Sequence, residues 1–158
     1  MDETACAGVD LEEIFRRYER MVFVYFLRMV RTRADAEDLT QETFVRACAA
    51  AIRFRGEAAV STWLLGIARR VLYEAARSGL FDQTEALPEA APSEDMDKRI
   101  DLDLALRLLS PPDREAILLV DVLGFSPMEA ATIANASREA FRVRLHRARK
   151  RFQEVYSR

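Results

Sequence analysis

The chain has 158 residues, enough for one domain or two small ones, and its charged residues nearly balance at a net charge of −2. Half of the residues are apolar and 32% are charged, which is typical of a soluble globular protein and excludes a disordered chain. Only five Gly and five Pro interrupt long runs rich in Ala, Leu, Arg and Glu, and these runs predict an all-α fold.

The cysteine pattern and the absence of targeting signals indicate a reducing compartment. Cys6 and Cys48 lack metal-ligand spacing and the lone His146 adds no partner, so we expect no metal and no cofactor. No signal peptide is visible, and the apolar stretch 21–30 is bounded by arginines and too short to span a bilayer. We therefore expect a cytoplasmic protein with no membrane insertion.

Two long helices are predicted at the start of the chain. The first begins at Asp10 and ends near residue 30, because its apolar residues follow the spacing of one buried face. These residues are Leu11, Ile14, Phe15, Tyr18, Val22, Tyr25, Phe26 and Met29. The second runs from about Ala34 to Arg53, with Phe44 at the centre of its buried face. Thr40, Ala47, Cys48 and Ala51 are expected beside Phe44.

The opposite face of the second helix mixes one apolar residue with charged ones. At 100° per residue, Leu39 falls on the exposed side among carboxylates. The residues gathered there are Asp35, Asp38, Leu39, Gln41 and Glu42. A single exposed Leu on a solvated face needs no explanation, yet the same set would suit docking of a basic protein partner. The pattern alone leaves both interpretations open.

A loop over residues 54–60 separates this helix from the next. Gly56 breaks the helical pattern, and Ser61 or Thr62 is expected to cap a helix running from Thr62 to Arg77. Aromatic and basic side chains surround the loop: Arg53, Phe54, Arg55, Trp63, Arg69, Arg70 and Arg77. A single-stranded base needs such a stacking face and such positive charge. The alternative is that Phe54 and Trp63 are core residues, which we favour for Trp63, with its edge touching the binding surface.

Residues 78–97 are predicted to form a flexible acidic linker between two helical domains. This segment contains Pro88 and Pro92 and shows little apolar periodicity. Six acids and no base lie between residues 82 and 97: Asp82, Glu85, Glu89, Glu94, Asp95 and Asp97. We therefore place the two domains at residues 10–77 and 98–158.

Four helices are predicted in the second domain. The first covers about residues 98–109, and the second starts after Ser110, where prolines suit the first turn, and ends at Gly124. Ser126 and Glu129 have the spacing of a capping box at the start of the third helix. The segment 135–137, Asn-Ala-Ser, then ends that helix and caps the last one.

The last helix is strongly basic. Residues 138–151 hold seven bases and one acid, a net charge of +6. They are Arg138, Arg142, Arg144, Arg147, Arg149, Lys150 and Arg151 against Glu139. A basic helix after a tight turn is the expected signature of a helix-turn-helix that reads the DNA major groove. A solvated helix with a basic tail, or an amphipathic helix for a protein partner, would show the same pattern.

In their order, these segments resemble an extracytoplasmic-function (ECF) sigma factor of bacterial RNA polymerase. ADAEDLTQETFVRA (34–47) resembles the polymerase-docking helix of sigma region 2, and STWLLGIARR (61–70) resembles the segment that melts and reads the −10 element. SPPDREAILLVDVLGFSPMEAATIA (110–134), followed by RLHRARKRF (144–152), resembles region 4, which reads the −35 element. The resemblance covers about residues 10–155 and implies a region 2 bundle followed by a four-helix region 4 domain.

The resemblance also implies which residues make contacts. Those facing the clamp helices of the polymerase β′ subunit are Asp35, Asp38, Leu39, Gln41 and Glu42. Those at the −10 element are Phe54, Arg55, Ser61, Trp63, Arg69 and Arg70. Those at the −35 element are Ser137, Arg138, Glu139, Arg142, Arg144 and Arg147. The implied partners are the polymerase core, including its β flap, promoter DNA and an anti-sigma factor.

We therefore expect an initiation factor that binds core polymerase, reads both promoter elements and helps to melt the promoter. It is not expected to be an enzyme, because no residue set resembles a nucleophile with its base, a metal cluster or a phosphate-cradling loop. The chain departs from the family pattern at Arg70, usually Asn, at Asn135, often Gly, and at residues 139–141, often Gly-Thr-Val. The alternatives are a stand-alone helix-turn-helix regulator and a sigma-like decoy that titrates a regulator.

Overall fold

The computed structural model describes residues 5–6, 9–79 and 94–157, and side chains only within 10–79 and 101–157. Within these residues the α-helices are α1 (Leu11–Met29), α2 (Arg33–Ala50), α3 (Val60–Arg77), α4 (Glu94–Arg107), α5 (Pro111–Ile117), α6 (Pro127–Ile133) and α7 (Arg138–Tyr156). A 3-10 turn, Ala51–Arg53, follows α2, and a π-helical turn, Leu118–Val122, continues α5. The strands β1 (Ala5–Cys6) and β2 (Val9–Asp10) form a short antiparallel pair ahead of α1. The predicted all-α fold is confirmed.

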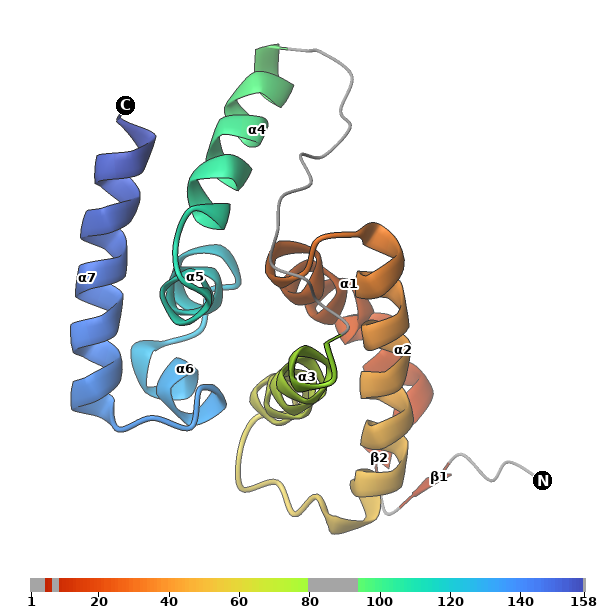
Figure 1. The fold of residues 1–158 in the computed structure, drawn as a ribbon. Coiled ribbons are helices and arrows are strands. Elements are labelled where there is room, and N and C mark those ends of the chain that lie inside the picture. Colours follow the sequence, from red (N-terminus) through yellow and green to blue (C-terminus); the bar gives the residue numbers. More distant parts are fainter. Residues whose placement is uncertain (1–4, 7–8, 80–93, 158) are drawn as a thin grey trace.

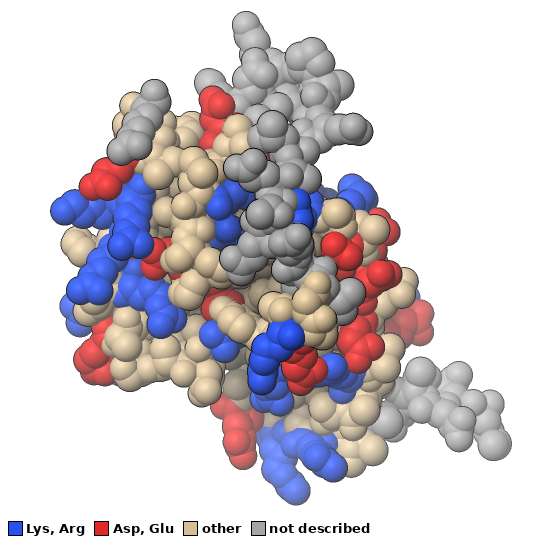
Figure 2. Space-filling model, viewed as in Figure 1, with Lys and Arg blue, Asp and Glu red and all other residues tan. Residues whose placement is uncertain are grey.

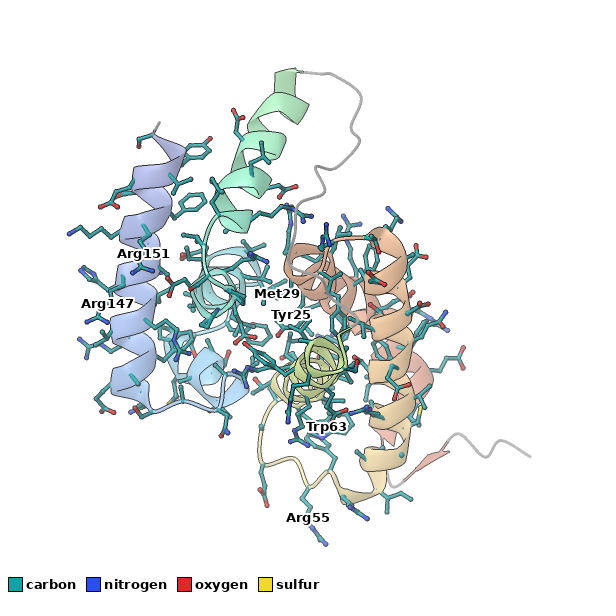
Figure 3. All side chains as sticks on the ribbon, viewed as in Figure 1. Tyr25, Met29, Arg55, Trp63, Arg147 and Arg151 are labelled. Carbon is teal, nitrogen blue, oxygen red and sulfur yellow. The ribbon has the colours of Figure 1, made fainter. Side chains whose placement is uncertain are left out.

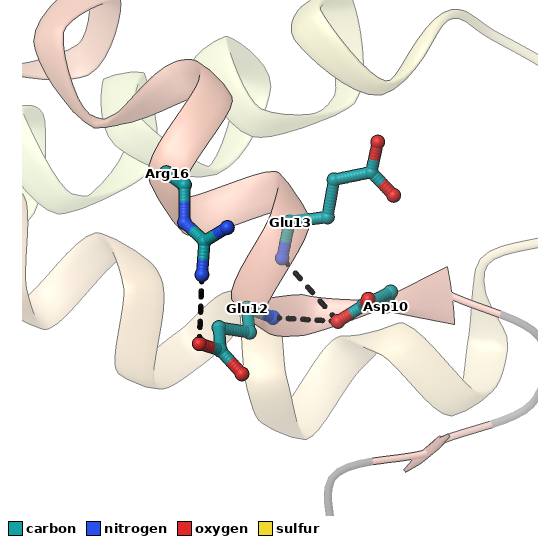
Figure 4. Close-up of polar contacts among 4 residues, drawn as sticks. All are labelled: Asp10, Glu12, Glu13 and Arg16. Carbon is teal, nitrogen blue, oxygen red and sulfur yellow. Dashed lines mark hydrogen bonds and ion pairs between the residues drawn. The ribbon is translucent and has the colours of Figure 1, made fainter.

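The first half of the molecule is a bundle of α1, α2 and α3 (Figure 1). Asp10 caps α1, since its carboxylate accepts hydrogen bonds from the backbone N–H groups of Glu12 and Glu13, at 3.1 and 3.3 Å (Figure 4). Arg16 pairs with Glu12 one turn along the same helix, at 2.9 Å. The bundle core is formed by apolar side chains of α1 and α3, among them Val22, Phe26, Leu64 and Leu65.

Several details of this bundle differ from the sequence prediction. Cys48 is exposed and Phe15 is 42% exposed, whereas Thr43, which the helical pattern did not single out, is buried. Thr43 tolerates burial because its hydroxyl donates to the Leu39 carbonyl at 2.8 Å. The predicted caps of α3 were wrong: this helix begins at Val60, and its capping residue, Ala59, makes no side-chain hydrogen bond.

The second half consists of α4 to α7. Ser126 and Glu129 form the predicted capping box, with both reciprocal hydrogen bonds present. Asn135 adopts a left-handed backbone at φ 51°, and Ser137 accepts a hydrogen bond from the Ala140 N–H, so the predicted turn before α7 is confirmed. Ser110 precedes α5 as expected but makes no side-chain capping bond.

The predicted linker falls mostly on residues 80–93, which lie outside the described residues. The acids Asp82, Glu85 and Glu89 belong to that segment. The helix α4 already begins at Glu94, so its first turn includes residues that were predicted to belong to the linker.

The two halves pack against each other in this structure. Helix α3 lies on α6, and α1 touches α4, α5 and the π-helical turn (Figure 1). Buried side chains form one continuous cluster that includes Val22 and Phe26 of the first half and Leu118, Leu119 and Phe141 of the second. The candidate sites on the two halves therefore have a defined spatial relation.

Candidate nucleic-acid and partner interfaces

A small pocket opens beside the loop that joins α2 to α3. The rings of Phe54 and Trp63 face each other there, with centroids 4.7 Å apart and planes tilted by 35°. Arg55 and Arg70 line the same pocket, whose volume is about 390 Å³. Figure 3 shows Trp63 at the start of α3 and Arg55 on the loop, pointing away from the protein. Four of the six residues predicted for the −10 element thus lie around one pocket that combines aromatic faces with positive charge.

The other two predicted residues, Ser61 and Arg69, do not line this pocket. Its walls also include five residues of the first half that were not among the six, one of them an acid: Arg53, Glu57, Ala58, Thr62 and Gly66. The sequence held a signal for Gly66, because Trp63, Gly66 and Arg70 are spaced by three and four and share one face of α3.

Arg69 points instead toward the second half of the molecule. Its Nε donates to the carboxylate of Glu115 at 3.0 Å, and the same carboxylate accepts from the Tyr25 hydroxyl at 2.6 Å. The Arg69 guanidinium also lies over the ring of Tyr73, 4.4 Å from its centroid. Burial acts to lower the pKa of Arg69, but the charge and hydrogen bond of Glu115 outweigh burial, so the pKa of Arg69 is raised. For Tyr25, burial and Glu115 act in the same direction and raise the pKa well above its ordinary value. Arg69 is therefore charged and engaged inside the protein.

The basic helix α7 presents its side chains along one edge of the molecule (Figures 2 and 3). Among the described residues, four of its arginines form no ion pair with a carboxylate: Arg138, Arg142, Arg144 and Arg147. Arg142 and Arg147 are exposed and Arg144 is half-buried. These four are the arginines predicted for the −35 element. Because no carboxylate of the described residues neutralises them, their charges are available to an outside partner.

The remaining arginines of α7 with described partners hold the helix in place. Arg149 donates to both oxygens of Asp121, at 3.0 and 2.7 Å, and Arg151 donates to Asp113 at 3.1 Å. Both acids belong to α5 and its π-helical continuation, so these pairs fix the orientation of α7.

At the start of α7, the predicted −35 residues have different roles. Ser137 caps the helix, and Arg138 contacts the sulfur of Met128 on α6. Glu139 is exposed and, with Arg144 and Arg147, borders a hollow between α7 and the start of α5. Asp113 and Arg151, which pair with each other, line the same hollow, so two acids and three bases border it.

The outer face of α2 carries the predicted docking residues. Three of the five are exposed: Asp38, Gln41 and Glu42. Leu39, expected on the exposed side, is half-buried and packs against the core, so that part of the prediction was wrong. Asp35 is also half-buried, while Glu42 pairs with Arg46 at 2.9 Å. In Figure 2, acidic side chains gather on the side of the molecule where α2 lies, opposite the basic α7.

The described part of the chain holds no group of three or more His, Cys, Asp or Glu residues that could bind a metal ion. None of the helices described here is long and apolar enough to cross a bilayer.

This protein consists of a helical bundle with an acidic outer face, followed by a helix-turn-helix domain. That arrangement is typical of the two-domain proteins built from sigma regions 2 and 4. Comparison with protein families supports this class directly: residues 14–79 match Sigma-70 region 2, and residues 99–152 match Sigma-70, region 4.

Comparison with individual relatives identifies the subfamily within this class. The chain is 32% identical over 152 residues to the RNA polymerase sigma factor CarQ of Myxococcus xanthus, covering 91% of this chain and 87% of that one. It is 36% identical over 135 residues to the ECF RNA polymerase sigma factor SigC of Mycobacterium tuberculosis, covering 80% and 71%. The sigma factor RpoE of Bartonella quintana, solved in complex with the anti-sigma factor NepR, matches with a TM-score of 0.79 and 28% identity over 94% of this chain and 97% of that one. The chain belongs to the ECF sigma factors and directs promoter-specific initiation by RNA polymerase.

Proposed function

We propose that the two halves of this sigma factor bind different parts of the polymerase and of the promoter. Residues 10–77 bind the β′ clamp helices through the outer face of α2 and hold an unpaired base of the −10 element in the Phe54–Trp63 pocket. Residues 98–158 read the −35 duplex through α7 and contact the β flap. The segment 78–97 remains a proposed linker, shortened at its end by the first turn of α4.

The pocket beside Trp63 is the observation that carries this proposal. An unstacked base offers two apolar faces and a charged backbone, and the pocket combines two aromatic rings with three arginines, Arg53, Arg55 and Arg70. Holding such a base uses binding energy to keep the promoter strands apart. We propose that the protein acts by binding alone, without chemistry of its own, in the bacterial cytoplasm.

An anti-sigma factor is the proposed regulatory partner. The RpoE structure with NepR is a complex of this kind, and it covers nearly the whole of the present chain. We propose that a regulator also binds this protein.

The decisive experiment is run-off transcription with purified core polymerase over a promoter library. A sigma factor should give transcripts from a defined promoter class only when core and protein are both present. Specific duplex binding by the free protein, with no transcripts in the presence of core, would favour the stand-alone regulator. Binding to a regulator, with neither duplex binding nor transcripts, would favour the decoy.

A further inference from the structure

A buried carboxylate lies where the two halves of the molecule meet. Glu115 of α5 is only 1% exposed, and its two oxygens accept from Tyr25 of α1 and Arg69 of α3. The two donors are 90 and 46 residues away along the chain, and both belong to the first half. This contact therefore exists only while the halves are together. In Figure 3, Tyr25 lies between them.

Two further contacts join the halves at other places. Thr132 and Ile133 of α6 line the same pocket as Phe54 and Trp63. In addition, an ion pair links Arg28 of α1 to Asp103 of α4. The second half thus forms one wall of the pocket, and its Glu115 pairs with the guanidinium of Arg69.

We propose that this closed arrangement is self-inhibited, with the second half of the chain occupying the surface that binds the −10 strand. Glu115 takes the position of a DNA phosphate at Arg69, and α6 narrows the pocket for the extruded base. This inference rests on the proposed function, because it assumes that the first half binds single-stranded DNA. Opening of the halves frees Arg69 and the pocket together.

The chemistry of the contact suits a reversible closure. A buried ion pair gains little net stability, because removing both charges from water offsets most of their attraction. A DNA phosphate offers Arg69 the same charge as the carboxylate and likewise has two oxygens that can accept from a guanidinium. A strand held close by polymerase therefore competes with Glu115 on nearly equal terms.

The test substitutes Glu115→Gln in the full chain, which removes the charge and preserves the shape. Affinity is measured by fluorescence anisotropy with a fluorescein-labelled pool of random single-stranded DNA. Opening is measured by energy transfer between dyes on Cys48 and on a Ser157→Cys position, in a Cys6→Ser background. We expect binding about tenfold tighter, the size of one charge-assisted hydrogen bond, together with lower transfer efficiency. Glu154→Gln, on the exposed surface of α7, removes the same charge and should change neither reading.

Tyr25→Phe is the second variant, since it deletes only the hydroxyl that holds Glu115 and leaves Arg69 unaltered. It should act in the same direction, by about threefold. Unchanged or weaker single-strand binding by both variants, with normal transcription in the presence of core polymerase, would overturn the self-inhibition. Absence of both transcription and single-strand binding in the parent protein and in both variants would instead overturn the proposed function.

Discussion

The basic residues of α7 differ in whether a carboxylate of the protein already neutralises their charge. Arg149 and Arg151 are neutralised by Asp121 and Asp113, whereas Arg142 has no carboxylate partner among the described residues. A phosphate that approaches a paired arginine must displace its carboxylate, so we propose that contact with DNA falls mainly on the unpaired ones.

The double variant Arg142→Ala and Arg144→Ala should therefore weaken binding to the −35 duplex and make it less sensitive to salt. Each lost phosphate contact removes about 0.9 from the slope of log affinity against log salt. The slope is measured by titrating promoter duplex with reconstituted polymerase at several salt concentrations. The control Arg16→Ala with Arg20→Ala removes the same charge from α1. An unchanged slope in the α7 variant would exclude these two arginines from the interface.

Asp38 is the exposed acid of α2 with no ion-pair partner in the described part of the chain. Asp38→Arg should reduce binding to core polymerase by at least about tenfold, because it turns an attraction into a repulsion on a complementary surface. The fold should remain, since the side chain is at the surface. Pull-down of core enzyme, with circular dichroism as the check on folding, measures both effects. Glu19→Arg makes the same change of charge on α1 and should bind normally; equal binding by the two variants would remove Asp38 from the docking site.

At the scale of helices, the sequence correctly predicted those helix ends that depend on residues close together in the chain. The capping box at Ser126, the left-handed Asn135 and the cap at Ser137 each depend on residues within four positions of one another. The start of α3 could not be predicted in this way, because it begins at Val60 without any side-chain cap and is held by packing of its buried face. The predicted exposure of Leu39 was wrong for a similar reason. The angular position of a residue around one helix does not show whether neighbouring helices cover part of that face.

The two serines that precede helices in the second half provide a matched stability test. Ser126 makes a capping hydrogen bond to the Glu129 N–H at 3.1 Å, whereas Ser110 makes none. Ser126→Ala should lower the free energy of unfolding by about 1 kcal/mol, and Ser110→Ala should change it by less than about 0.5 kcal/mol. Urea unfolding followed by circular dichroism gives both values. Equal losses would mean that the capping bond adds no stability of its own.

At the scale of the whole molecule, the two halves share a buried contact that no sequence pattern predicted. From the sequence, Arg69 was expected to contact DNA and Glu115 was not singled out, because a charged residue inside a helix is ordinarily solvated. Periodicity within one helix holds no information about a partner 46 residues away. The pocket was more predictable, since its aromatic and basic residues are close together in the sequence.

The shared contact should make stability depend on alkaline pH. The raised pKa of Tyr25 means that the folded protein retains a proton that an unfolded tyrosine releases above about pH 10. The stabilisation is therefore complete below pH 10 and declines as pH rises further, by at most about 1.4 kcal/mol per pH unit for this group. Urea unfolding between about pH 8 and 11 measures the decline, and Tyr25→Phe should reduce its slope. A slope unaffected by Tyr25→Phe would show that the hydroxyl does not titrate in a buried site.

The continuous cluster of buried side chains has a consequence for how such a protein diversifies. Leu118, Leu119 and Phe141 are packed in the same cluster as Val22 and Phe26, so each half imposes a shape on the other. A chimera that joins residues 10–77 to the corresponding second half of another sigma factor would combine two units, each proposed to bind DNA, whose contacting faces do not match. The two halves are thus expected to evolve as a pair, even though each is proposed to read a separate promoter element.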